Sequence, residues 1–101
     1  MPSNRVQATL NVLTGDEGGR TAPFNLGYRP QFHAAGSISD TSFIIEQIEG
    51  GRTQMAPGES ALVVAYIMFP DEIGVPVVEG MTFELREGFT VVARGRIIAF
   101  L

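Results

Sequence analysis

Apolar and polar residues alternate with a period of two in several short segments of this chain. Every second residue from Val6 to Val12 is apolar, and the same pattern recurs from Met81 to Arg86. Glycine or proline separates these segments from one another. A period of two bounded by turn residues is typical of β-strands, whereas an amphipathic helix repeats every 3.6 residues. The pattern therefore predicts a chain built from short strands.

Six strands are predicted, at residues 6–12, 28–35, 41–48, 60–69, 81–86 and 89–101. Pro30 cannot donate a ladder hydrogen bond, which indicates an edge, a bulge or a strand start at that position. The strand at 60–69 is almost continuously apolar, which favours burial on both faces or packing of one face against a neighbouring domain. The strand at 89–101 has apolar residues in both phases, so its register is not determined.

The number and spacing of these strands, with no helical stretch of ten residues, favour an all-β fold. A small antiparallel barrel and a sandwich both fit this pattern. A closed barrel has the advantage that it leaves no strand edge exposed. The sequence shows no internal repeat or linker, so we expect one domain over residues 1–101.

The composition mainly excludes certain kinds of chemistry and certain classes of protein. The chain has 45% hydrophobic and 18% charged residues, which is ordinary for a globular domain, and no cysteine, which excludes disulfides and thiolate chemistry. The longest apolar run, Ala61 to Phe69, is about half of the ~20 residues that a membrane-spanning helix needs. No secretory signal is visible at the N-terminus. We therefore expect a cytoplasmic protein without a membrane partner.

The net charge is −4, from seven arginines and eleven acidic residues, with no lysine. Non-specific binding to nucleic acid depends on Lys and Arg that neutralise several phosphates. The charge balance therefore argues against autonomous nucleic-acid binding, and we expect no DNA partner. A local arginine patch remains compatible with these numbers.

No catalytic constellation is visible. A P-loop requires a lysine, which the chain lacks, and His33 is the only histidine, so a histidine metal cluster is out of reach. His33 is interpreted as a strand residue without a catalytic role. We predict no catalytic residue, no metal site and no cofactor.

Two groups of charged residues leave alternatives open. Glu46, Glu49 and Glu59 are interpreted as a solvated face, with a carboxylate metal site as the alternative. Arg94 and Arg96 share one face of the last strand. They form either an anion-facing pair or the exposed side of a strand, with Glu84 or Glu87 as cross-strand partners.

Three motifs carry a resemblance to a known family. Asp16 to Arg20 (DEGGR) is followed by Gly27 to Phe32 (GYRPQF); Met55 to Glu59 (MAPGE) precedes the long apolar strand; and Gly80 to Gly88 (GMTFELREG) forms the third motif. In this order they resemble the C-terminal β-barrel domain, domain III, of bacterial-type elongation factor Tu, over roughly residues 5–100. The resemblance implies a six-stranded antiparallel closed barrel.

The resemblance also implies partners. In the full-length factor this domain helps to hold the T stem of aminoacyl-tRNA, packs on the GTPase domain and touches the nucleotide-exchange factor. The residues that match the tRNA-contacting part of the motif are Arg20, Gln31, Glu87 and Gly88. The lysine that the family adds to this surface is absent.

Departures from the family fall in loops. The connections from Phe32 to Pro57 and from Pro70 to Gly80 look a few residues longer than in the family. Where the family has a second glycine and an arginine in its closing hairpin, this chain has Phe89 and Thr90. Loops are where binding specificity usually resides.

The favoured hypothesis is a non-catalytic, translation-related binding module that takes a protein partner more readily than tRNA. Its candidate binding residues are Arg20, Arg29, Gln31, Arg86, Glu87 and Gly88. The alternative is a structural domain that has lost RNA binding and forms a homo-oligomer through the apolar segments 63–69 and 97–101. An enzyme is a third hypothesis, which we disfavour because no nucleophile, base and orienting group can be assembled.

Overall fold

The computed structural model describes residues 4–101. Its strands are β1 (Arg5–Val12), β2 (Phe24–Asn25), β3 (Gln31–His33), β4 (Thr41–Ile48), β5 (Gln54–Met55), β6 (Ser60–Ile67), β7 (Thr82–Glu87) and β8 (Thr90–Phe100). Three 3-10 turns, η1 (Gly15–Glu17), η2 (Glu49–Gly51) and η3 (Pro70–Glu72), lie between strands. Within the described residues, no helix is long and apolar enough to cross a membrane.

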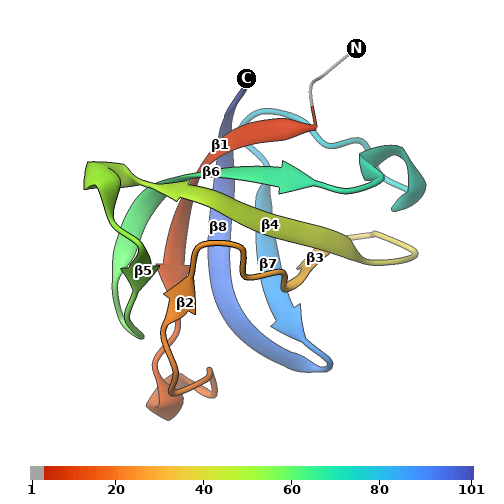
Figure 1. Cartoon of the computed structure of the whole chain (residues 1–101). Helices are drawn as coiled ribbons and strands as arrows, with labels where there is room; N and C mark the ends of the chain where they lie inside the picture. Colours follow the sequence, from red (N-terminus) through yellow and green to blue (C-terminus); the bar gives the residue numbers. More distant parts are fainter. Residues whose placement is uncertain (1–3) are drawn as a thin grey trace.

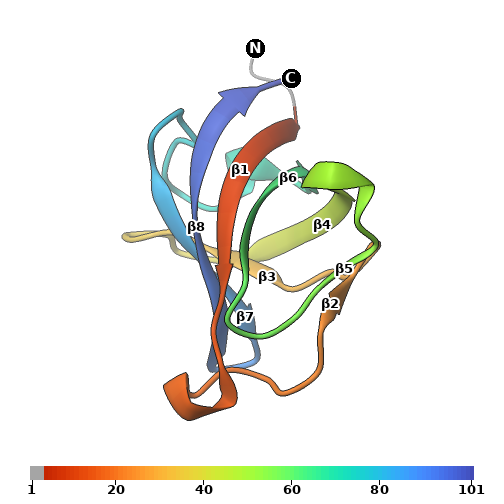
Figure 2. The ribbon, with the colours of Figure 1, turned by 90° about the vertical axis from the view of Figure 1, so that its left-hand side faces the viewer.

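Six of the strands form a closed antiparallel barrel in the order β1-β6-β4-β3-β7-β8, and β8 pairs back with β1 (Figure 1). The remaining two, β2 and β5, form a separate two-stranded sheet, which lies beside the barrel in both views (Figures 1 and 2). The prediction of an all-β, six-stranded closed barrel is confirmed. Closure pairs every barrel strand on both sides, so the barrel itself exposes no edge.

The inward face of β1 follows directly from its sequence. Val6, Ala8, Leu10 and Val12 are all at most 1% exposed, because successive strand side chains point to opposite faces. Inside the barrel they meet three phenylalanines from three strands: Phe32, Phe43 and Phe83. The ring centroids of these phenylalanines lie 4.9–6.2 Å apart. The core is therefore aromatic at its centre and aliphatic around it.

The predicted strand at 41–48 coincides with β4, whereas the prediction for 28–35 was too long. β3 begins only at Gln31, because Pro30 has no N–H to donate to a ladder. The backbone before it still pairs through its carbonyls: Phe43 N–H donates to Pro30 C=O, and Ile45 N–H donates to Tyr28 C=O. Pro30 therefore marks a strand start, one of the options that the sequence left open.

Of the two options that the sequence left for β6, burial on both faces is not what the structure shows. Ala61, Val63, Ala65 and Ile67 point into the barrel and are buried, whereas the alternate residues Leu62, Val64 and Tyr66 are only half-buried on the outer face. The strand also ends at Ile67 rather than at residue 69. Its continuous apolar sequence thus gives an ordinary alternating strand with a partly apolar outer face.

Two irregularities in β8 explain why apolar residues occur in both of its phases. Opposite β7, the pairing shifts so that Val92 is an extra residue, and both Val92 and Ala93 are buried. Opposite β1, Ile98 is the extra residue and lies exposed. Each β-bulge moves the following side chains to the other face.

The β2–β5 sheet was not predicted. Its one cross-strand pair with buried side chains joins Phe24 to Met55, and both are fully buried against the barrel core. Strands of two residues are too short to display a period. The sequence signal for this sheet is therefore absent, although both of its buried side chains are large and apolar.

Candidate partner-binding surface

Arg20 lies at the centre of a compact cluster of side chains. Its guanidinium is 4.6 Å from the ring centroid of Tyr28 and 5.7 Å from that of Phe24, and its Nη1 is 3.3 Å from Oε1 of Glu87. The rings of Phe24 and Tyr28 are themselves 4.5 Å apart. A guanidinium over an aromatic face is attracted by the ring quadrupole. Arg20 is thus held in one place by two rings and one carboxylate.

The loop before Arg20 is fixed by its own sequence. Thr14 and Glu17 form a capping box around η1, in which each side chain accepts from the backbone N–H of the other. Gly18 ends the turn at φ 88°, a left-handed conformation that costs glycine little. Gly19 then packs on Leu13, where a Cβ would lie 2.8 Å from the Leu13 carbonyl oxygen. This close approach directs Arg20 back towards the barrel.

Gln31 and Arg86 face one another across β3 and β7. Arg86 donates to Oε1 of Glu84 at 2.6 Å from Nη2, so its charge is partly neutralised within its own strand. Glu87 pairs with Thr90 in the closing hairpin, and Gly88 turns between them at φ 61°. A Cβ at Gly88 would meet open space, so its backbone is accessible to a ligand.

The structure therefore places five of the six predicted residues in two neighbouring pairs: Arg20 and Glu87 form an ion pair, Gln31 and Arg86 are opposite in the β3–β7 register, and Gly88 follows Glu87. Arg29 is directed elsewhere. It donates from Nη2 to Sδ of Met68 at 3.2 Å, at the end of β6. Because β4 lies between β3 and β6, Arg29 points away from the β3–β7 pair.

One surface residue was missed from the predicted set. Phe89 follows Gly88 at the tip of the β7–β8 hairpin and is fully exposed, at 102% of its reference area. The sequence carried a signal for it, because an aromatic residue replaces a glycine of the family at a turn. We define the hairpin-cluster surface as Arg20, Tyr28, Glu87, Gly88 and Phe89.

The Tyr28 hydroxyl is buried at the base of this surface. Its oxygen has no hydrogen bond of ordinary geometry among residues 4–101, although Arg20 and Glu87 lie close enough to shift its pKa. Burial raises the pKa of Tyr28 to about 12; the Glu87 carboxylate also raises the pKa, whereas Arg20 lowers it. Because the folded-state pKa lies above the ordinary value of 10, the stability contributed by this group is complete below about pH 10 and is lost as the pH rises towards 12.

Replacing Glu87 by glutamine should lower the pKa of Tyr28, because the substitution removes the nearby anion that disfavours tyrosinate. Ultraviolet absorbance of tyrosinate measures this titration, and Tyr28→Phe identifies the step that belongs to Tyr28. Glu79→Gln, at the opposite end of β7, is the matched control and should leave the pKa unchanged. An equal shift in both variants would contradict a direct Glu87–Tyr28 interaction.

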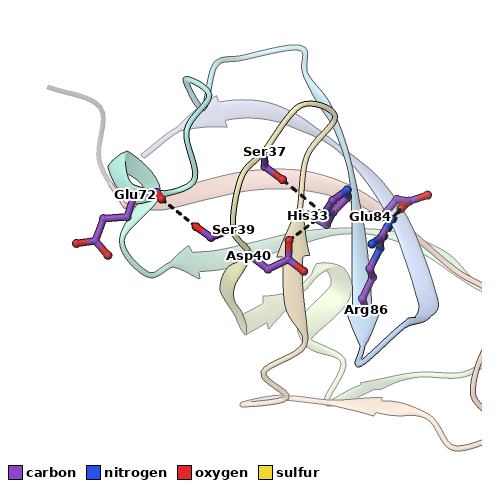
Figure 3. A network of polar contacts seen from close by, with 7 residues as sticks. All are labelled: His33, Ser37, Ser39, Asp40, Glu72, Glu84 and Arg86. Carbon is purple, nitrogen blue, oxygen red and sulfur yellow. Dashed lines mark hydrogen bonds and ion pairs between the residues drawn. The ribbon is translucent and has the colours of Figure 1, made fainter.

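His33 lies in a polar network beside β7, drawn in Figure 3. Its Nδ1 is 2.8 Å from Oδ1 of Asp40 and 3.5 Å from Oγ of Ser37. A Ser-His-Asp triad uses opposite ring nitrogens for the serine and the aspartate. Since both partners here approach the same nitrogen, His33 is not placed to take a proton from Ser37 while Asp40 orients its ring.

The acidic residues considered as a metal site are each engaged separately. Glu46 pairs with Arg5 at 2.6 Å, Glu59 with Arg52 at 2.6 Å, and Glu49 accepts the Leu62 backbone N–H at 2.9 Å. Among residues 4–101, no three His, Asp or Glu side chains are grouped to hold a metal ion. The three glutamates therefore make separate contacts on the surface.

Arg94 and Glu84 are cross-strand partners between β8 and β7, and Arg94 Nε lies 3.7 Å from Glu84 Oε2. Arg96 pairs in register with Thr82 and Thr9 rather than with an acid. The cross-strand interpretation therefore holds for Arg94. Arg96 is exposed on the same face, opposite two threonines.

A closed six-stranded antiparallel barrel with a flanking two-stranded sheet defines the chain as a small β-barrel domain. The family model for the elongation factor Tu C-terminal domain matches residues 1–101. The chain belongs to this family. A domain of this family is translation-related and non-catalytic by itself.

Proposed function

We propose that the protein is a cytoplasmic binding module in translation, and that its hairpin-cluster surface takes a protein partner rather than tRNA. The observation that carries this proposal is Phe89, fully exposed beside Glu87 and Gly88. Aromatic residues and arginine are enriched among the residues that dominate protein–protein binding energy. Phe89 contributes little to folding in this position, because it buries no surface within the domain.

The charges of the surface support the same choice. Arg20 is already paired with Glu87 and Arg86 with Glu84, so both cations are partly neutralised before any ligand arrives. Phosphate binding depends on cations that gain more from the phosphate than from their present partners. Glu84 and Glu87 would also repel an RNA backbone. A protein surface that offers an apolar pocket and a few polar groups fits these side chains better.

The experiment is a pair of titrations with the purified protein. The isolated GTPase domain of an elongation factor Tu is the protein probe, because this domain packs against the barrel in the family's full-length factors. Aminoacyl-tRNA is the RNA probe, measured at two salt concentrations. Phe89→Ala and Arg20→Ala are the test variants, and Thr53→Ala, on an exposed loop outside the hairpin-cluster surface, is the control.

We expect saturable binding of the GTPase domain that weakens at least about tenfold in Phe89→Ala, a loss typical of an interface hot spot. We expect no saturable binding of tRNA. Salt-dependent binding of tRNA that Arg20→Ala weakens would instead assign the surface to RNA. Equal binding of the GTPase domain by Phe89→Ala and the parent protein would remove Phe89 from the interface.

A further inference from the structure

Two loops at the other end of β7 pack on each other: residues 34–40, between β3 and β4, and residues 68–81, between β6 and β7. Ile38 N–H donates to Ile73 C=O at 2.7 Å, and Ser39 Oγ donates to Glu72 C=O at 2.9 Å, the second contact being drawn in Figure 3. Ile73 is fully buried beneath them. We name these segments the paired loops. They form one tied unit on the barrel.

The paired loops expose large apolar side chains. Ile38 is 83% exposed, Phe69 is 57% exposed and Val78 is 48% exposed. Ile38 lies over Gly74, where a Cβ would be only 2.6 Å from Ile38 Cγ1, so one side of Ile38 rests on the loop and the other faces solvent. All three side chains belong to the same tied unit, and large exposed apolar groups on one unit favour an interaction surface.

Phe69 adds a second, independent observation. It is the one non-glycine residue with positive φ among the described residues, at φ 46° and ψ 53°. A bulky side chain rarely occupies this left-handed region, which glycine adopts freely. The loop holds Phe69 there, because its carbonyl accepts Glu72 N–H at 3.0 Å and the Met68 carbonyl accepts Thr41 Oγ1. Such strain at an exposed aromatic residue favours a role outside folding.

The charges around these apolar groups indicate which kind of partner surface would bind there. Asp71, Glu72 and Glu79 are exposed, and the paired loops contain no arginine or lysine. Asp40 is paired with His33, and Arg29 reaches the edge of the unit at Met68. The rim is therefore acidic. A second copy of the same face would place these acids against one another, which disfavours self-association through this face.

We propose that the paired loops form a second docking surface, for a protein that presents an apolar surface rimmed by lysine or arginine. Phe69 and Ile38 are its anchors, and Asp71, Glu72 and Glu79 meet the basic rim. This surface lies apart from the hairpin-cluster surface, because the two lie at opposite ends of β7. Six strand residues separate them by about 20 Å. The protein can therefore bridge two partners.

The probe for this proposal is a fluorescently labelled synthetic peptide of leucine and lysine, titrated into the full chain by fluorescence anisotropy. Two matched peptides test the stated chemistry: one replaces lysine by glutamate, and the other replaces leucine by serine. Phe69→Gly and Ile38→Ser are the test variants, and Thr53→Ala, on an exposed loop outside both surfaces, is the control. Thermal denaturation of each variant accompanies the titration.

We expect the leucine–lysine peptide to bind at least about tenfold more tightly than either matched peptide, and each test variant to weaken it at least about tenfold. Thr53→Ala should leave its binding unchanged. The melting temperature of Phe69→Gly should be no lower than that of the parent protein, because glycine adopts the left-handed conformation freely.

Three results would overturn the proposal. The first is a lower melting temperature of Phe69→Gly, which would indicate a merely structural role. The second is equal binding of the leucine–lysine peptide by the parent protein and the test variants. The third is a dimer, seen by sedimentation velocity, that Phe69→Gly abolishes.

Discussion

Gly95→Ala should lower the free energy of unfolding by about 3 kcal/mol, at the upper end of the cost of overpacking a core. Gly95 lies in β8, where a Cβ would be 2.5 Å from Cζ of Phe83 and 2.5 Å from the carbonyl oxygen of Thr9. The first contact is with a ring inside the close-packed core, and the second is with the backbone of β1. Neither group can move without disturbing the barrel.

Thermal denaturation should show this loss as a fall in melting temperature on the order of 10 °C for a domain of this size. Gly15→Ala is the matched control. Its Cβ would meet only the Cγ2 atom of Thr21, at 3.3 Å, which is the end of an exposed side chain. A change within about 0.5 kcal/mol is expected there. Equal stability of the two variants would show that β8 does not approach β1 and Phe83 as closely as described.

Phe43→Ala should cost about 3–5 kcal/mol, the range for truncating a buried aromatic side chain. Phe43 is fully buried, with its ring centroid 6.2 Å from that of Phe32 and 5.2 Å from that of Phe83. Its loss leaves a cavity between two rings that belong to different strands. Because the surrounding strands are closed into a barrel, the wall cannot collapse fully around that cavity.

Phe89→Ala removes the same side chain from a fully exposed position and should change the free energy of unfolding by less than about 0.5 kcal/mol. Urea denaturation of the two variants measures the difference. A cost for Phe89→Ala comparable to that for Phe43→Ala would mean that Phe89 packs within the domain. It would then be unsuitable as a binding anchor.

The strands that the sequence predicted well are those whose period is unbroken. β1 and β7 have one buried face each, so alternation identifies their inward residues and, to within one residue, their extent. In β8 the same principle fails, because the bulges at Val92 and Ile98 change the phase twice within one strand. A bulge is fixed by pairing with a neighbouring strand, and a single strand's sequence does not contain that partner's register.

The candidate surface was predicted in part. Motif resemblance singled out Arg20 and Glu87, and the fold adds that they form an ion pair. That pairing depends on the loop after η1 folding back to the β7–β8 hairpin, which no local pattern predicts. Arg29 was predicted to belong to the same surface, yet its side chain contacts Met68 beyond β4. Its neighbour Tyr28 instead contacts Arg20, because adjacent residues in an extended segment point to opposite sides.

Phe89 and Phe69 illustrate a different limit. Both are apolar residues in turns, and alternation provides no information on side chains outside strands. Their exposure, at 102% and 57%, becomes visible only when the barrel is closed and the surface is complete. The two proposed docking surfaces each depend on one of these residues. The structure was therefore needed to locate both surfaces.

The most direct test of the central claim is a nuclear magnetic resonance titration of the isotope-labelled protein with the isolated elongation factor Tu GTPase domain. Amide shift changes should cluster at Arg20, Tyr28, Glu87, Gly88 and Phe89, and aminoacyl-tRNA should produce no such cluster. Shift changes at these residues with tRNA alone, or changes with the GTPase domain that spare all five, would contradict a protein-binding role for the hairpin-cluster surface.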